Sequence, residues 1–330
     1  MIFNAWHDAG RPIIALVGPT ASGKTGLGVA LAQRLGMEII NADSMQVYRG
    51  MDIGTAKPTD AERKAVPFHI IDVVDPDGDW TLSQFQERAV LEWNRIVERG
   101  MVPIIVGGTG LYVRSLTTDL RIPAVPRDPE IRRVWTDFAE EFGNSALHQR
   151  AYEIDPVAAA KVHVNDLHRL TRILEVHSLT GERLSDLHAR NAGEAAELNV
   201  LLIGLDSSDR RRLYSRIEAR VDEMMAAGFL DEVCSLTHRG YDSVLSPMRS
   251  LGYEQLADVL QNKASLGDAV VDIKRETRHF ARRQLIWFRA DKRIHWVDIG
   301  LMSPDDIASD IELYVRRKLS NSKGSESYHE

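Results

Sequence analysis

Gly18-Pro19-Thr20-Ala21-Ser22-Gly23-Lys24-Thr25 matches the phosphate-loop pattern G-x-x-x-x-G-K-S/T at every required position. The stretch follows an apolar run at residues 13–17 and precedes apolar residues at helical spacing, namely Leu27, Ala30, Leu31 and Leu35. In this strand–loop–helix context the glycines let backbone N–H groups approach an anion, and the helix N-terminus adds partial positive charge. Lys24 is expected to reach terminal phosphates, and Thr25 to hold Mg²⁺. The loop therefore predicts phosphate binding, but it does not say whether the ligand is a nucleotide such as ATP or another diphosphate.

Composition places the chain among ordinary globular proteins. It has 330 residues, of which 44% are hydrophobic and 27% charged, and a formal net charge of −7. This length allows one large domain or two modest ones. No apolar run approaches the length of a membrane span, residues 1–11 lack a signal-peptide core, and the single cysteine, Cys234, fits a reducing compartment. We therefore expect a cytoplasmic protein that does not contact membranes.

Apolar runs typical of strands alternate with helical periodicity along most of the chain. The runs lie at residues 13–17, 38–41, 68–74, 102–106, 200–205 and 294–298. This alternation predicts an α/β fold like that of the phosphate-loop NTPases, with a parallel sheet and helices on both faces.

One segment, residues 121–197, breaks the alternation, because it opens with Pro123, Pro126 and Pro129 and then shows helical patterns without a convincing strand. We predict a helical insertion domain at 121–197 between two parts of the core, 1–120 and 198–317. Residues 318–330 are rich in serine and charge and are predicted to form a disordered tail.

Two further strands run into residues that a ligand site can use. The second ends in Asn41-Ala42-Asp43-Ser44-Met45-Gln46, and ligands gather at the carboxyl ends of strands in such sheets. Asp43 can accept a proton or support Mg²⁺ through water, or it can merely cap the following turn. The fourth run leads into a glycine turn at residues 107–110, where Thr109 offers a hydroxyl. That strand lacks the terminal acid of typical phosphate-loop hydrolases, which disfavours a motor or switch ATPase.

Basic residues are concentrated in two helical segments. Residues 271–293 contain eight lysines and arginines against three acids. At helical spacing Arg275, Arg278, Arg282 and Arg289 share one arc, and we expect Phe280, Gln284, Trp287 and Phe288 to face a core. A smaller cluster occupies residues 168–172. Two basic faces on an acidic protein favour a polyanion such as RNA or DNA, although each face alone is also typical of a solvated helix.

A third basic pattern, Arg212, Arg216 and Arg220, repeats every four residues and so forms one helical stripe. A solvated stripe is its usual explanation. A nearby pyrophosphate would change that interpretation, because guanidinium groups suit bidentate phosphate contacts.

These residues together resemble the tRNA dimethylallyltransferases, also called tRNA isopentenyltransferases. The resemblance rests on blocks at residues 18–25, 43–48, 51–58, 106–112, 166–172, 249–253 and 283–289, which follow the family's order. The chain has no Cys/His array near its C-terminus, so it resembles the bacterial form rather than the eukaryotic form with a zinc finger. Ile286 departs from the threonine that many relatives carry there.

The resemblance implies transfer of a dimethylallyl group from its diphosphate to the exocyclic amine of the adenine just 3′ of the anticodon. The phosphate loop would then hold the leaving diphosphate with Mg²⁺, and the adenine would leave its stack to reach it. Asp43 matches the family's candidate general base, whereas Thr20 and Arg220 match positions for diphosphate binding and catalysis. The partner would be the anticodon stem-loop, and we expect a monomer.

The resemblance also carries over a set of positions that contact tRNA in the family. In this sequence they are Asp43, Ser44, Met45, Gln46, Thr109, Arg132, His168, Arg169, Leu170, Thr171, Arg172, Met248, Arg249, Ser250, Leu251, Gly252, Tyr253, Arg278, Arg282, Arg283, Gln284 and Arg289.

Other functions remain open at this stage. An adenylate dimethylallyltransferase would prenylate a free nucleotide, but it would need neither the helical insertion nor the basic helix. A small-molecule kinase would use the same loop with ATP, but it does not explain the Asp43 block. A non-enzymatic RNA-binding module would leave the phosphate loop without a task.

Overall fold

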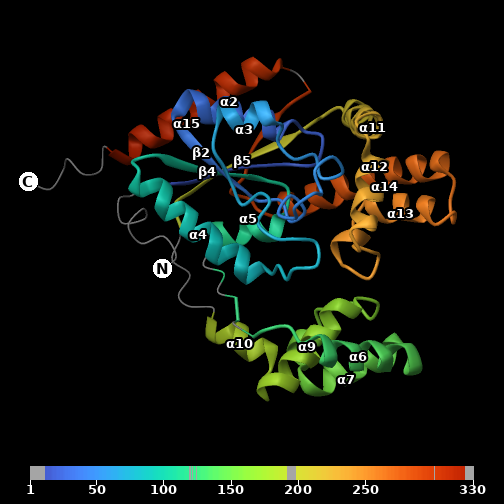
Figure 1. Cartoon of the computed structure of the whole chain (residues 1–330). Coiled ribbons are helices and arrows are strands. Elements are labelled where there is room, and N and C mark those ends of the chain that lie inside the picture. Colours follow the sequence, from blue (N-terminus) through green and yellow to red (C-terminus); the bar gives the residue numbers. More distant parts are fainter. Residues whose placement is uncertain are drawn as a thin grey trace, which may run out of the picture. The chain divides into compact units, whose positions relative to one another are not determined.

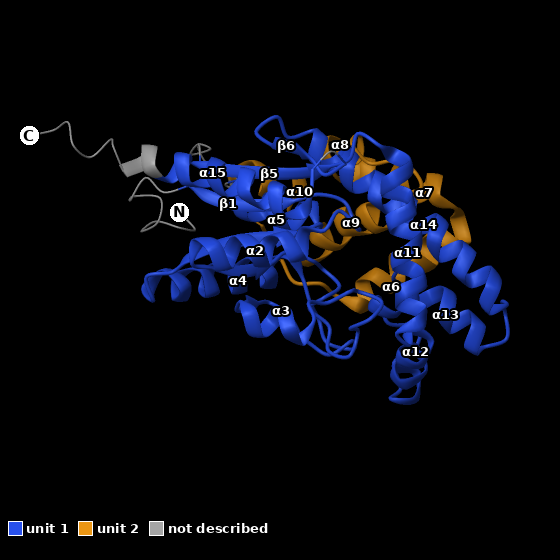
Figure 2. Ribbon diagram, turned by 90° about the horizontal axis from the view of Figure 1, so that it is seen from above, with its two compact units in different colours: residues 1–118, 197–330 blue, residues 119–196 orange. Residues whose placement is uncertain are grey.

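The chain forms two units, which are coloured separately in Figure 2. Unit 1 comprises residues 1–118 and 197–330, and unit 2 comprises residues 119–196. The computed structural model describes residues 12–118, 120, 122–123, 125–191, 198–300 and 302–323. The sequence predicts a helical insertion at residues 121–197, and unit 2 of the structure spans residues 119–196.

A six-stranded sheet with only parallel pairs lies at the centre of unit 1 (Figure 1). Its strands are β1 (Ile13–Val17), β2 (Met37–Asn41), β3 (Phe68–His69), β4 (Val102–Gly107), β5 (Val200–Asp206) and β6 (His295–Asp298), in the order β3-β2-β4-β1-β5-β6. The winding direction reverses at β1, between β4 and β5, and ligands bind at such switch points. Val17 pairs with Gly107 and Asn41 with Val106, so these carboxyl ends lie in line.

Helices cover both faces of this sheet. Unit 1 contains α2 (Lys24–Leu35), α3 (Asp60–Ala65), α4 (Leu82–Glu98), α5 (Gly110–Thr117), α11 (Arg210–Ala226), α12 (Phe229–His238), a 3-10 helix (Pro247–Arg249), α13 (Tyr253–Leu260), α14 (Leu266–Arg289) and α15 (Pro304–Lys323). Alternate residues of β1 enter different cores: Ala15 packs with α4 and α5, whereas Leu16 packs with α2 and α15. The predicted α/β class is confirmed.

Local sequence explains where these helices begin. Thr81 and Gln84 form a reciprocal capping box at the start of α4, and Phe85, Ala89 and Trp93 then recur at helical spacing and are fully buried. No helix among the described residues is long and apolar enough to cross a membrane.

Two predictions about element lengths are wrong. The strand expected at 68–74 ends at His69, because Ile70 and Asp72 have φ angles of 64° and 56° and turn the backbone away from the sheet. The tail expected from residue 318 is helical as far as Lys323, because Ile311, Val315 and Leu319 continue the packed stripe of α15. Residues 324–330 lie outside the described residues.

Unit 2 consists of helices around a small core of its own. They are α6 (Pro129–Phe142), α7 (Asn144–Ile154), α8 (Pro156–Ala159), α9 (Leu167–Thr180) and α10 (Leu184–Asn191). Asp128 caps α6 by accepting from two backbone N–H groups, Pro129 occupies the first turn, and Asp166 caps α9. The buried core contains Ala139, Leu147, Ala151, Ala159, Leu170, Ile173 and Leu174.

Candidate active site

The phosphate loop joins β1 to α2 with a backbone that few residues can adopt. A Cβ at Gly18 would lie 2.7 Å from the carbonyl oxygen of Leu205 on β5, so only glycine fits there. Ala21 and Gly23 have φ angles of 60° and 86°, which curl the loop back over the start of α2. No side chain among the described residues caps α2. The first N–H groups of this helix are therefore available to an anion.

Gln284 of α14 braces this loop against the end of β4. The backbone N–H of Thr20 donates to Oε1 of Gln284 at 2.8 Å, and Nε2 of Gln284 donates to the carbonyl oxygen of Gly108 at 2.9 Å. Gln284 is buried, as predicted, but its amide is occupied by the protein itself. It therefore positions the loop and also lines a cavity, and its assignment as a tRNA contact stays a prediction.

The turn after β2 is tied to the turn after β4. The Thr109 hydroxyl accepts from the backbone N–H of Ser44 at 3.0 Å and donates to the Ser44 hydroxyl at 3.2 Å. Asp43 Oδ1 accepts from the backbone N–H of Met45 at 2.9 Å, while the Asp43 side chain also lines a cavity. Asp43 thus caps its own turn and also faces a ligand-sized space, so capping does not withdraw it from the cavity.

Two cations beside the loop form no ion pair with a carboxylate of the described residues. The pKa of Lys24 is lowered to about 7, mainly by burial and also by the Arg220 guanidinium, while Asp43 partly opposes both. Burial also lowers the pKa of Arg220. Lys24 Nζ donates to the carbonyl oxygen of Pro19 at 2.6 Å, and no carboxylate of the described residues lies within ion-pair distance of Lys24 or Arg220. Because buried charges are normally paired, this excess of positive charge suits an anionic ligand.

A cavity of about 460 Å³ connects these groups with an apolar wall. Its polar lining includes Thr20, Lys24, Thr25, Asn41, Asp43, Ser44, Gln46, Thr109, Arg220 and Arg283. Its apolar lining includes Met45, Val221, Met224, Phe229, Leu251, Tyr253, Ile273 and Phe280. From Gln284 to Ile273 along α14 the lining changes from polar to apolar over roughly 16 Å of helix. The cavity can therefore hold a ligand with an anionic head and an apolar tail.

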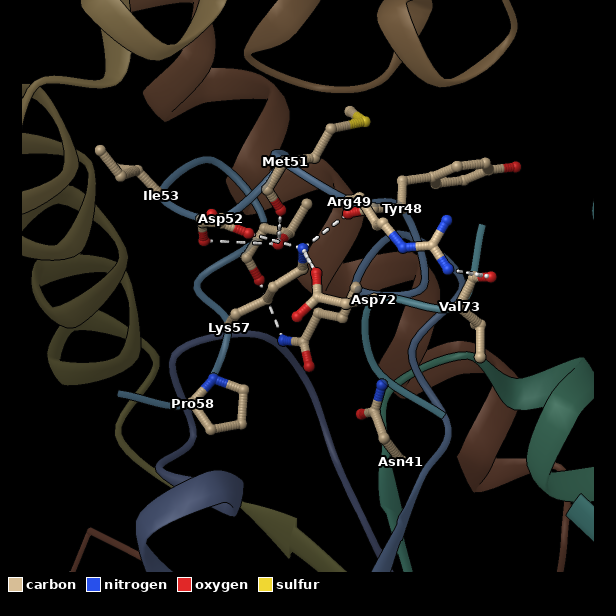
Figure 3. A network of polar contacts seen from close by, with 12 residues as sticks. Asn41, Tyr48, Arg49, Met51, Asp52, Ile53, Lys57, Pro58, Asp72 and Val73 are labelled. Atoms are coloured by element: carbon tan, nitrogen blue, oxygen red, sulfur yellow. Dashed lines mark hydrogen bonds and ion pairs between the residues drawn. The ribbon is translucent and has the colours of Figure 1, made fainter. Parts of the chain in front are cut away.

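Lys57 holds the loop that follows Asp43 (Figure 3). Its buried Nζ donates to the carbonyl oxygen of Tyr48 at 2.6 Å, to Asp52 at 2.6 Å and to Asp72 at 2.5 Å. Nε2 of Gln46 donates to the carbonyl oxygens of Thr55 and Ala56 at 3.0 and 3.1 Å. The predicted site did not include Lys57. Its place in the block at residues 51–58 was the signal that could have found it.

Glu232 of α12 ties the same loop to the cavity wall. Its carboxylate accepts from the backbone N–H groups of Asp52, Ile53 and Gly54 at 2.9, 2.7 and 3.2 Å, and from the Tyr253 hydroxyl at 2.7 Å. Sequence reasoning missed Glu232, because an acid within an amphipathic helix carries no signal of its distant partners.

Comparison with known proteins assigns the family. A family model described as IPP transferase matches residues 46–291. The chain belongs to the IPP transferase family. The tRNA dimethylallyltransferase of Syntrophobacter fumaroxidans is 48% identical over 87% of this chain and 83% of that relative.

Solved structures agree with this assignment. The tRNA isopentenylpyrophosphate transferase of Bacillus halodurans matches with a TM-score of 0.71 at 38% identity, over 96% of this chain and 99% of that one. A eukaryotic dimethylallyltransferase acting on tRNA matches with a TM-score of 0.78 at 26% identity, over 94% and 79%. The resemblance drawn from the sequence is confirmed.

Within this IPP transferase family member, residues 248–253 divide between core and cavity. Met248 and Tyr253 are each 1% exposed; Tyr253 lines the cavity and Met248 packs in the core, and their assignment as tRNA contacts stays a prediction. Burial, with Glu232 adding to it, raises the pKa of Tyr253. Ser250 and Leu251 line the cavity, Arg249 is exposed, and Gly252 has a φ of 90° against the ring of Phe229.

The basic helix α14 proves to be mostly paired. Arg278 binds Glu218 at 2.6 Å, Arg289 binds Asp206 at 2.5 Å, and Arg275 pairs with Asp272. Arg282 is exposed, and no carboxylate within the described ranges lies in ion-pair distance of it. Arg283 lines the cavity, with its guanidinium 5.9 Å from the ring centre of Phe280. Unneutralised positive charge on this helix is therefore concentrated around residues 282–283.

The apolar side of α14 also differs from the prediction. Phe280 and Trp287 were expected to face a core but are 38% and 41% exposed, whereas Leu285, expected near the arginines, is 5% exposed. Phe280 lines the first cavity, and Trp287 lines a second one of about 590 Å³ beside α5. A Cβ at Gly110 would lie 2.1 Å from the Trp287 ring, so the indole rests on backbone rather than in a core. Contacts with α11, α13 and α5 on several sides of α14 explain the shift.

Unit 2 contains the other predicted tRNA contacts, and Glu175 organises them. This fully buried carboxylate pairs with Arg132 at 2.7 Å and Arg172 at 2.6 Å, and despite its burial these hydrogen bonds lower its pKa to about 2. The side chains of Leu170 and Thr171 are buried within unit 2, and their assignment as tRNA contacts stays a prediction. Burial lowers the pKa of His168, and Arg132 and Arg127 add to this effect. Arg169 is exposed beside Asp166.

Proposed function

We propose that this chain transfers a dimethylallyl group from dimethylallyl diphosphate to the exocyclic amine of the adenine 3′ of the anticodon in tRNA, releasing diphosphate. The observation that carries the proposal is the cavity in which a phosphate loop with unpaired Lys24 and Arg220 meets Asp43 and an apolar wall. Relatives named tRNA dimethylallyltransferase, 40–48% identical over most of the chain, support it. A free-nucleotide acceptor leaves the helical unit 2 and the exposed arginines of α14 unexplained, and an ATP-dependent kinase leaves the apolar wall and Asp43 unexplained.

Different residues of the cavity support different parts of the transfer reaction. The amine nitrogen of adenine forms a bond to the first carbon of the dimethylallyl group, the bond from that carbon to the diphosphate oxygen breaks, and the amine proton passes to Asp43. The loop N–H groups, Thr20, Lys24 and Arg220 stabilise the charge that grows on the departing diphosphate. The apolar wall from Val221 to Phe280 holds the alkyl chain and excludes water.

We infer that Mg²⁺ accompanies the diphosphate. The Thr25 hydroxyl and the Asp43 carboxylate line the cavity, and Mg²⁺ favours such oxygen donors together with substrate phosphates. Within the part of the chain that the structure describes, no cluster of three His, Cys, Asp or Glu residues could hold a metal alone. Thr25 would therefore hold the ion with the diphosphate, and the ion would neutralise negative charge on the leaving group.

The anticodon stem-loop is the proposed macromolecular partner. The exposed Arg282, the cavity-lining Arg283 and the exposed Arg249 supply positive charge in unit 1, and Arg169 supplies it in unit 2. The adenine would enter between Asp43 and Thr109 after leaving its stack. We propose that the enzyme acts as a monomer in the cytoplasm, the compartment of the tRNA substrate.

Incubation with radiolabelled dimethylallyl diphosphate tests the proposal. Purified protein, Mg²⁺ and the labelled donor are mixed with either unmodified tRNA or AMP, and both acceptors are analysed for label. We expect label in tRNA only. Label in AMP only would establish the free-nucleotide activity instead. No transfer to either acceptor, with consumption of ATP in a parallel assay, would favour a kinase.

A further inference from the structure

The helix that carries Arg220 also brings a second guanidinium to the phosphate loop. Arg216 lies four residues earlier on α11, and therefore on the same side of the helix. Its Nη2 atom would lie 3.1 Å from a Cβ built on Gly23, so the guanidinium rests against the N-cap residue that precedes α2. Arg220 lines the cavity, whereas Arg216 is exposed and does not line it. The two arginines thus reach the loop from inside the cavity and from its outer edge.

Arg216 has no acidic partner to account for this position. No carboxylate among the described residues lies within ion-pair distance of it, and Glu218, its neighbour on α11, is bound to Arg278 at 2.6 Å. Burial and the nearby Arg212 both lower the pKa of Arg216. Arg212 itself is engaged, because it donates to the carbonyl oxygen of Gly300 at 2.6 Å. Of the two neighbouring arginines, only Arg216 presents an unoccupied guanidinium to the loop.

We propose that Arg216 is a catalytic residue that binds the terminal phosphate of the diphosphate from the outer edge of the loop. The proposal rests on the proposed function and adds a residue to the same site. Lys24, Arg216 and Arg220 lie around the start of α2, where Asp43 is a carboxylate that affects both Lys24 and Arg220, and Glu223 also affects Arg220. A diphosphate carries several negative charges, and a planar guanidinium can donate to two phosphate oxygens at once. Arg216 would hold the diphosphate most strongly after the alkyl group has left, because the released anion carries more charge.

Calorimetric titration with inorganic pyrophosphate and Mg²⁺ tests this role without tRNA. The proteins compared are the unaltered chain, Arg216→Gln, Arg216→Lys and, as matched control, Arg212→Gln, which removes the same charge one turn away. A hydrogen bond to a charged group contributes about 1.5–3 kcal/mol, so we expect Arg216→Gln to weaken pyrophosphate binding by about 10- to 100-fold. Arg216→Lys should recover part of this loss, and Arg212→Gln should change affinity less than about 2-fold.

Steady-state transfer adds a second measurement. Arg216→Gln should raise KM for dimethylallyl diphosphate and lower kcat, while leaving KM for tRNA unchanged. Equal pyrophosphate affinity in Arg216→Gln and the unaltered chain would overturn the proposal. Equal losses in Arg212→Gln and Arg216→Gln would also overturn it, because they would reveal a general effect of charge. If the unaltered chain itself fails to bind pyrophosphate, the proposed function fails first, so the two failures are distinguishable.

Discussion

Lys24 lines the cavity and Lys57 holds the loop that follows Asp43, and the two lysines have opposite surroundings. Lys57 is surrounded by its own partners, with Asp52, Asp72 and the Tyr48 carbonyl oxygen all within 2.6 Å of its ammonium group. Lys24 has a single backbone carbonyl oxygen at 2.6 Å, and the neighbouring Arg220 repels it. The first arrangement is electrostatically complete without a ligand, and the second is not.

This contrast separates stabilising cations from ligand-binding cations within one protein. A buried charge with satisfied partners helps to fix the backbone around it, and removing it leaves the partners uncompensated. A buried charge that lacks partners costs stability in the free protein and recovers that cost when an anion binds. Arg278 and Arg282 repeat the contrast on α14, because the first is paired with Glu218 and the second has no carboxylate within ion-pair distance in the described chain.

The largest effect is expected from Lys24→Met. Removing a donor aimed at developing charge typically lowers kcat by about 10²- to 10³-fold, and we expect dimethylallyl transfer to fall by that much. Unfolding in urea should show equal or greater stability, because the substitution removes a buried cation beside Arg220. A clear loss of stability would contradict the assignment of Lys24 as a cation kept for a ligand.

The pH dependence of stability provides a second test of Lys24. Its pKa is lowered from 10.5 to about 7 in the folded protein, so between these values the unfolded chain binds more protons than the folded one. The unfolding free energy of the unaltered chain should therefore rise relative to Lys24→Met as pH increases from 7 toward 10.5. A flat difference across this range, measured by urea unfolding at several pH values, would contradict the lowered pKa.

Asp43→Asn and Asp43→Ala separate the two roles of the side chain. The asparagine substitution would retain an oxygen that can cap the Met45 N–H but would lose the basic carboxylate, whereas the alanine substitution removes both. Removing a general base lowers turnover by about 10²-fold or more, and we expect both variants to show this loss in single-turnover reactions while retaining tRNA binding. An active Asp43→Asn variant would reduce Asp43 to a turn cap.

Lys57→Met should lower the free energy of unfolding rather than the affinity for pyrophosphate. Removing one member of a buried ion cluster can cost 3–5 kcal/mol, but Asp52 and Asp72 are partly exposed, so we expect a loss of about 2 kcal/mol. Arg63→Gln is the matched control, because Arg63 also pairs with Asp72 but is itself partly exposed, and it should cost less than about 1 kcal/mol. Pyrophosphate binding should persist in folded Lys57→Met, and its loss would contradict a purely supporting role.

The contrast also shows what the sequence could predict. The phosphate loop, the alternation of strands and helices, and Asp43 at a strand end are local patterns, and each maps directly onto one place in the fold. Gln46, Ser250 and Leu251 also line the cavity as part of recognisable blocks. The hydrogen-bond partners of a side chain are harder to predict. Glu232 accepts from backbone N–H groups of residues 52–54, which lie about 180 positions away in the sequence. No local pattern marks such a partner.

Burial was the other property that the sequence left undecided. Met248, Leu170 and Thr171 lie in blocks that match tRNA-contacting positions, yet their side chains pack inward. A short motif fixes the residues at a site without saying which of them form its surface and which form the wall behind it. For the same reason the sequence predicts a single apolar face for α14. In the structure, its contacts with α5, α11 and α13 leave Trp287 partly exposed and bury Leu285.

The smallest effect, on the salt dependence of tRNA binding, is expected from substituting an unpaired and a paired arginine of α14. Each phosphate contact contributes about 0.7–0.9 to the slope of log affinity against log salt concentration. Arg282→Gln should lower this slope for tRNA by nearly that amount and weaken binding several-fold at moderate salt. Arg278→Gln changes the net charge equally, but Arg278 must leave Glu218 before it can bind a phosphate, so its slope should change less. Fluorescence titrations at several salt concentrations measure both slopes. Equal slopes for the two variants would show that pairing in the free protein does not decide which cations bind the RNA.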